Sequence, residues 1–420
     1  MVVQARDAEA EAMLTKLLDD KTYHIEFNGY LSNHVKQALV ALAGLGGDAA
    51  AIRGYWNEYT RVTPYGLNLD PAEPLDKVTT TFTEEDWERV LGKKVEFAAL
   101  CRFFDEQERK LGTKGVLRRY MPTLVTGCPG ALTHGAIHLG WGLDAGHRWM
   151  TIEGLAYMAY THVSIHPERF VNSAHADAMP VQSLLRIADE WASQDVGKWV
   201  AGVVEDPKYS EASGFRKELV VTGFQWKVAK VLEEGHPLFY QLPAWLDTMD
   251  VPAMLEALYK AVTLLYLGTA GQPDRPAGPE QRGNFLVLHL ITSLWGHEHI
   301  LAAGDLEVEQ QRQALKCFWV TLLALIFTTS GGFPTRAALE GVNDKFGTAA
   351  DASPTAVQEG QDWEALVPLS MAEEEEHNIK LVYVERELWR RYGKWSGFHV
   401  AASSFTDTPN IGPGKQPFST

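Results

Sequence analysis

Apolar residues at three- and four-residue spacing most constrain how this chain folds. This spacing puts apolar side chains on one face of a helix, whereas a half-buried strand alternates apolar and polar residues. The helical spacing occurs in residues 34–45, 84–104, 131–143, 151–160, 180–194, 251–267, 284–303, 308–328 and 373–392. Strand patterns are few. The sequence therefore predicts an all-α fold, a single large multi-helix domain with long loops.

The sequence shows no boundary between domains. No fixed-period repeat is visible, which disfavours a solenoid, and no stretch has the composition of a linker. Residues 406–420 are rich in proline and glycine. We expect one helical domain over residues 1–405 and a tail over residues 406–420.

Net charge restricts the partners. The chain has 54 acidic and 38 basic residues, which gives a formal net charge of −16. Such a surface repels phosphate and argues against a nucleic-acid or anionic-membrane partner. The longest apolar run, residues 317–328, is too short to predict a membrane span. The acidic start lacks the apolar stretch of a secretory signal. We expect a cytoplasmic protein, and the sequence leaves the oligomeric state open.

Several catalytic signatures are missing. A dinucleotide-binding G-x-G-x-x-G turn must follow a strand and open a helix. The nearest match, residues 44–47, follows a predicted helix and has the wrong spacing. The G-x-S-x-G elbow of serine hydrolases is also missing. Three widely spaced cysteines support neither a disulfide framework nor a cysteine-based zinc site. Neither a Rossmann cofactor site nor a serine hydrolase is supported.

Histidines in apolar helical segments are the unusual feature of this sequence. His134 and His138 lie four residues apart on one predicted helix face, a spacing that suits two ligands of one metal ion. Two hydrogen-bonded core histidines explain the same spacing. His289 lies within an aliphatic run, where burial requires a specific partner. That partner is either a metal, a backbone carbonyl or Thr292.

The predicted C-terminal helix carries a further pair. His377 and Lys380 are three residues apart and therefore lie on one face. In one interpretation, Lys380 forms an ion pair with Glu376 and the acidic run complements the helix N-terminus. In the other, His377 binds a metal and Lys380 reacts with carbon dioxide to form a carbamate. The carbamate oxygens would then bind a cation as a carboxylate does.

Five short motifs occur in an order typical of one family. In chain order they are Asn33-His34 before a helix ending in Leu-Gly, His134-Gly-Ala-Ile-His138-Leu-Gly-Trp-Gly, Glu153-Gly-Leu-Ala156, His289-Leu-Ile-Thr292 and His377-Asn-Ile-Lys380. Together they resemble the questin oxidase-like family, over about residues 24–389. More narrowly, the sequence is similar to the fungal non-haem iron oxygenases of this group that cleave anthraquinone rings. It departs at Gln37, where family members often carry a second histidine.

The resemblance implies a helical oxidoreductase of secondary metabolism, a dioxygenase or monooxygenase. Its substrates would be O₂ and an anthraquinone-type aromatic polyketide, opened by cleavage of a carbon–carbon bond. For the ring-cleaving branch it implies a mononuclear Fe(II) held by histidines and a carboxylated lysine.

The ligands that the resemblance carries over are His34, His134, His138, His289, His377 and Lys380. Of these, His138, His377 and Lys380 are also expected to be catalytic. An octahedral iron that binds oxygen cannot take all six residues. We therefore expect four of the five histidines and carboxylated Lys380 as ligands, with His34 or His134 left outside. The carbamate replaces the carboxylate of the usual two-histidine, one-carboxylate set.

Three alternatives remain open at this stage. An NADPH-dependent Baeyer–Villiger-type questin oxidase would use NADPH as an external reductant. A helical ligand-binding scaffold without catalysis would use the histidines structurally. A zinc hydrolase is less well supported, because the His134–His138 pair lacks the glutamate of the H-E-x-x-H motif.

Overall fold

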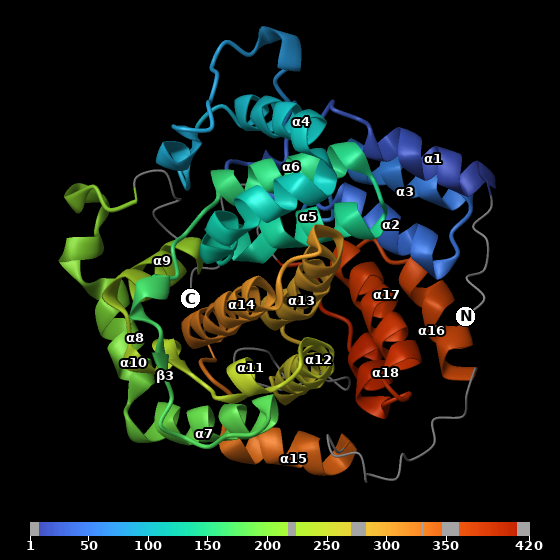
Figure 1. Cartoon of the computed structure of the whole chain (residues 1–420). Helices are drawn as coiled ribbons and strands as arrows, with labels where there is room; N and C mark the ends of the chain where they lie inside the picture. Colours follow the sequence, from blue (N-terminus) through green and yellow to red (C-terminus); the bar gives the residue numbers. More distant parts are fainter. Residues whose placement is uncertain (1–7, 217–223, 270–282, 330, 347–360, 410–420) are drawn as a thin grey trace.

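The computed structural model describes residues 8–216, 224–269, 283–329, 331–346 and 361–409. Helices contain 70% of the residues and strands 3%. The prediction of an all-helical fold is therefore confirmed. Helices α5, α13 and α17 lie at the centre of the molecule, and the others surround them (Figure 1).

The helices follow one another with short 3-10 turns and loops between them. Their bounds are α1 Ala8–Leu18, α2 Val35–Leu45, α3 Ala49–Arg61, α4 Phe97–Leu124, α5 His134–Asp144, α6 Arg148–Tyr160, α7 Pro180–Ser193, α8 Val196–Glu205, α9 Phe224–Glu234, α10 Pro237–Tyr240, α11 Trp245–Thr248, α12 Val251–Gly268, α13 Phe285–Gly304, α14 Val308–Thr328, α15 Arg336–Phe346, α16 Gln361–Met371, α17 Glu376–Arg391 and α18 Ser396–Ser403. Two short strand pairs complete the described part: antiparallel β1 Glu26–Phe27 with β2 Leu31–Ser32, and parallel β3 Val171–Asn172 with β4 Gln241–Leu242.

Most predicted helices are present, but the segment 84–104 is wrong as one helix. It contains a short 3-10 turn, Trp87–Val90, and then the start of α4 at Phe97. Gly92 between them has a φ of +66°, and a Cβ there would lie 2.2 Å from the carbonyl oxygen of His162. Its backbone N–H donates to Ala159 instead of continuing a helix. This left-handed glycine, tied to another segment, ends the helical path.

Small residues let the central helices approach closely. A Cβ added to Gly140 of α5 would lie 2.1 Å from the Cα of Gly296 in α13. A Cβ added to Gly154 of α6 would lie 2.3 Å from the Cα of Leu139. Backbone therefore meets backbone on two sides of α5. This close packing fixes where the start of α5 lies relative to α13.

Helix α12 is long and apolar enough to pass a length-and-composition test for a membrane span. It lies inside the fold, with 72% of the tested residues buried, as a core helix does.

The segment 406–420, which the sequence predicts as a tail, begins inside the fold. Thr406 is buried, and its N–H and C=O both bond to the side chain of Asn378. Residues 410–420 of that prediction lie outside the described residues.

Candidate metal centre

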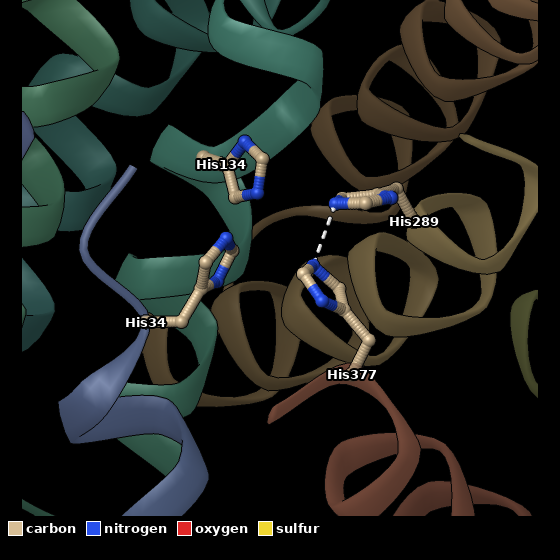
Figure 2. A group of neighbouring side chains, drawn as sticks. All are labelled: His34, His134, His289 and His377. Atoms are coloured by element: carbon tan, nitrogen blue, oxygen red, sulfur yellow. Dashed lines mark hydrogen bonds between the residues drawn. The ribbon is translucent and has the colours of Figure 1, made fainter. Parts of the chain in front are cut away.

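Four histidines from four distant segments converge in the interior (Figure 2). His34 immediately precedes α2, His134 is the first residue of α5, His289 lies in α13 and His377 lies near the start of α17. One nitrogen of each ring lies within 4.8 Å of a nitrogen of every other ring. Such a group could hold one metal ion.

The four rings form a closed square. Adjacent centroids are 4.5 Å apart for His34–His134 and His34–His377, 4.8 Å for His134–His289 and 4.7 Å for His289–His377. The diagonal from His34 to His289 is longer, at 6.3 Å. Phe285, one turn before His289, packs against the rings of His289 and His377. The square is thus shielded by an aromatic ring on one side.

Burial keeps these imidazoles neutral. His289 and His377 are fully buried, and His34 and His134 are nearly so. Burial lowers the pKa of His134 to about 3 and holds the pKa values of the other three well below the usual 6.5. The positive charge of Lys380 adds to this lowering of each pKa. Neutral imidazole is the form that binds metals.

Hydrogen bonds at Nδ1 turn the lone pairs of three rings inward. The Nδ1–H of His289 donates to the carbonyl of Phe285 at 2.8 Å, and that of His134 donates to the carbonyl of Ala131. His377 Nδ1 lies 2.5 Å from Oε1 of Glu375. The two carbonyl oxygens can only accept, so Nδ1 of His134 and of His289 carries the hydrogen and their Nε2 atoms carry lone pairs; Glu375 accepts from His377 in the same way when it is ionised.

The inward nitrogens have few hydrogen-bond partners other than one another. His289 Nε2 and His377 Nε2 lie 3.1 Å apart, within hydrogen-bond distance of each other (Figure 2). His134 Nε2 is buried and has no hydrogen-bond partner among the described residues. Two neighbouring imidazoles bound to one metal at roughly 2.1 Å place their nitrogens about 3 Å apart. The residues present therefore fit a metal ion.

Lys380 lies beside this square. It is fully buried, and its Nζ is 2.9 Å from Nδ1 of His34. Burial lowers the pKa of Lys380, and the nearby carboxylates of Glu375 and Glu376 oppose that change. The expected ion pair between Glu376 and Lys380 is not among the ion pairs of the described residues. Lys380 instead faces a metal-ligand candidate.

Two buried glutamates adjoin the centre. Glu375 bonds to His377, as described above. Glu376 accepts hydrogen bonds from the hydroxyls of Tyr65, at 2.8 Å, and Tyr59, at 3.4 Å. Burial raises the pKa of both carboxyls. The acidic run at the start of α17 thus points partly into the protein and not only toward solvent.

An unusual turn positions His134. Ala131, Leu132 and Thr133 all have positive φ angles of 48°, 53° and 66°. Three consecutive non-glycine residues in this region are costly, by roughly 1–2 kcal/mol each. The turn brings the carbonyl of Ala131 under the ring of His134, where it accepts the Nδ1–H. Strain of this kind is often held at functional sites.

His138 does not join the square. Its Nδ1 lies 2.8 Å from Nε2 of Gln37 and its Nε2 lies 3.3 Å from Oε2 of Glu153. Glu153 also binds Lys36, at 2.7 Å, and the indole of Trp149. The expectation that His34 or His134 would be left out therefore differs from the structure, which separates His138. A hydrogen-bonded network occupies both of its ring nitrogens.

Some of these neighbours could have been found in the sequence. Lys36 is a charged residue in an otherwise apolar helix, which signals a buried partner, and Glu153 is that partner. Gln37, the next residue of this helix, is also polar and buried, and its side chain lies 2.8 Å from Nδ1 of His138. Glu375 gave no distinct signal, because it sits in a run of four glutamates. The left-handed turn before His134 also has no sequence signature.

Packed helices around a buried square of neutral histidines define a helical protein with a candidate mononuclear metal centre. The family model for questin oxidase-like proteins matches residues 31–384, which include all four histidines and Lys380. The chain belongs to the questin oxidase-like family, and membership suggests an oxidoreductase. A search of curated proteins gave no significant match.

Proposed function

We propose that this protein is a non-haem iron oxygenase that opens a ring of an anthraquinone-type aromatic polyketide with O₂. The observation that carries the proposal is the convergence of four buried imidazoles, each with one nitrogen within 4.8 Å of the others, while His134 Nε2 has no hydrogen-bond partner among the described residues. Burial lowers the pKa of all four rings, which keeps them as neutral imidazoles, the form that binds metals. Family membership adds the oxidoreductase chemistry.

The chain supplies the ligands and the shielding. His34, His134, His289 and His377 would hold the metal, and Lys380, once carboxylated, would add an oxygen donor. Imidazole suits iron, zinc, copper and nickel, and an anionic oxygen donor favours iron over copper(I). Bound Fe(II) supplies the activation of O₂. Phe285 packs on two of the rings and, with the burial of all four histidines, keeps bulk water from that side.

Metal analysis tests the centre directly. Protein purified without oxygen or chelators should contain about one iron per chain. His377→Ala should lose the metal, whereas His138→Ala should keep it, because His138 lies outside the square and bonds to Gln37 and Glu153. Less than about 0.2 metal equivalents in the wild-type chain would favour the non-catalytic scaffold instead. Full loss of metal from His138→Ala would contradict the assignment of the four ligands.

Product analysis tests the reaction. The iron-loaded chain should consume O₂ with a hydroxylated anthraquinone and give a ring-opened product without NADPH. Turnover that strictly requires NADPH and yields an inserted-oxygen lactone would instead identify the Baeyer–Villiger-type alternative. Both measurements use the same panel of hydroxylated anthraquinones, so they also define which substitution pattern the substrate must have.

The carbamate on Lys380 has its own test. The chain exposed to ¹³C-bicarbonate should show a carbamate carbon resonance that is missing in Lys380→Ala. This variant should be inactive, and short carboxylic acids should restore part of its activity by supplying the oxygen donor. Normal turnover by Lys380→Ala would end this part of the proposal.

We also propose the cytoplasm as the working compartment, with small molecules rather than nucleic acids or membranes as partners. The net charge of −16 supports this proposal, since anionic polymers and surfaces would be repelled. Fractionation of the native cells tests it: recovery of the chain with membranes after a salt wash would contradict it.

A further inference from the structure

Each inward-facing ring needs an acceptor at Nδ1 to fix its orientation. For His134 and His289 this acceptor is a backbone carbonyl, of Ala131 and of Phe285. For His377 it is the side chain of Glu375, at 2.5 Å. Among these three acceptors, Glu375 alone is a side chain and alone can carry a formal charge.

Glu375 holds both the ring and the backbone of His377. It is the N-cap of α17, and its Oε1 also accepts the backbone N–H of His377 at 3.3 Å. Its side chain is only 4% exposed, so the carboxyl is not free to rotate into solvent. The same oxygen therefore sets the start of the helix and the direction of the imidazole.

We infer that Glu375 is a positioning residue for the metal ligand His377. An accepting carboxylate at Nδ1 fixes the tautomer that leaves Nε2 free, aims Nε2 at His289, and strengthens its donation to a metal. Partners of this kind typically contribute 10–100-fold to metal affinity. The inference rests on the metal centre of the proposed function, and it gives a role to a residue that the sequence does not distinguish within its run of glutamates.

Two other roles for Glu375 must be separated from this one. Glu375 could act only as a helix cap, in which case serine, a preferred N-cap residue, should replace it fully. It could also ligate the metal itself, because Glu375, Glu376 and His377 bring potential ligand atoms within 4.8 Å of one another. Each role predicts a different response to shortening or neutralising the side chain.

The test compares Glu375→Gln, Glu375→Ser and a control, Glu374→Gln. Glutamine keeps the reach but loses the charge, whereas serine keeps the cap but cannot reach the ring. Glu374 is exposed and one residue away. Affinity for Co(II) is measured by chelator competition without oxygen, together with the visible ligand-field bands and the urea unfolding of the metal-free chain.

We expect 10–100-fold weaker Co(II) binding for both Glu375 variants, with shifted band positions but retained coordination number. Glu375→Ser should unfold like the wild type without metal, and Glu374→Gln should match the wild type throughout. Wild-type affinity in Glu375→Ser would reduce Glu375 to a cap and overturn the inference. A loss as complete as in His377→Ala, with a changed coordination number, would make Glu375 a ligand and also overturn it. A wild-type chain that binds neither cobalt nor iron overturns the proposed function as well.

Discussion

A buried acid on the helix that carries His377 and Lys380 gives a quantitative prediction about stability. Glu385 of α17 is fully buried, and the hydroxyl of Thr263 donates to its Oε1 at 3.2 Å. Its Oε2 has no hydrogen-bond partner among the described residues. Burial therefore raises the pKa of Glu385 well above its usual 4.5, so the folded chain holds this proton to a higher pH than the unfolded chain does.

The sign of the pH dependence follows from this raised pKa. In the unfolded chain Glu385 ionises above about pH 4.5, whereas in the folded chain it remains neutral. The free energy of unfolding is thus highest below pH 4.5 and falls as the pH rises toward the folded pKa. For each pH unit between the unfolded and the folded pKa, the loss from this single group is at most about 1.4 kcal/mol.

Glu385→Gln removes the titration and keeps the acceptor for Thr263. The advantage of the variant over the wild type in stability should be larger at pH 7.5 than at pH 5.5, by at most about 1.4 kcal/mol per pH unit. Urea unfolding of the metal-free chains at both pH values measures this difference. Glu387→Gln, at a partly exposed ion pair with Arg390, is the control and should change stability by less than about 0.5 kcal/mol. Equal pH dependence in the wild type and Glu385→Gln would refute the reasoning.

Three further predictions concern packing, charge and metal. Gly140→Ala should lower the free energy of unfolding by about 1–3 kcal/mol, because the new methyl would meet the backbone of Gly296; Gly54→Ala in α3, which has open space, should raise it by about 0.5–1 kcal/mol. Lys36→Met should cost about 3–5 kcal/mol in urea unfolding, since it leaves the buried carboxylate of Glu153 without its cation; a cost below about 1 kcal/mol would contradict the buried pair. Metal at a thousand times its dissociation constant should stabilise the chain by about 4 kcal/mol, and a chelator should remove this gain in thermal melts of the wild type but not of His377→Ala.

Helices could be predicted from the sequence because their signal is local. The bounds predicted for the segment 308–328 are those of α14, because its apolar side chains recur at helical spacing. The prediction of one helix over residues 84–104 is wrong for a non-local reason. Gly92 is held by contacts with residues 159 and 162, and the residues next to Gly92 in the sequence do not reveal these contacts.

The candidate site could be predicted only in part. Apolar helical surroundings indicate His134 and His289, since buried imidazoles need partners, whereas His34 follows from the family resemblance and His377 from its spacing to Lys380. Spacing also paired His134 with His138, because four residues return a helix to the same face. The structure separates them: the left-handed turn at Ala131 turns His134 toward α13 and α17, whereas Gln37 and Glu153 hold His138. Which neighbours each ring meets depends on tertiary contacts.

The wide separation of the histidines along the chain has a consequence for how the protein is made in cells. His34 and Lys380, side by side in the fold, are 346 positions apart, and His377 lies almost as far from His34. A ribosome therefore releases most of the polypeptide before the last ligands emerge. A metal held by these histidines, as proposed above, would be loaded only after synthesis, and it would tie the two ends of the chain together as a cross-link does.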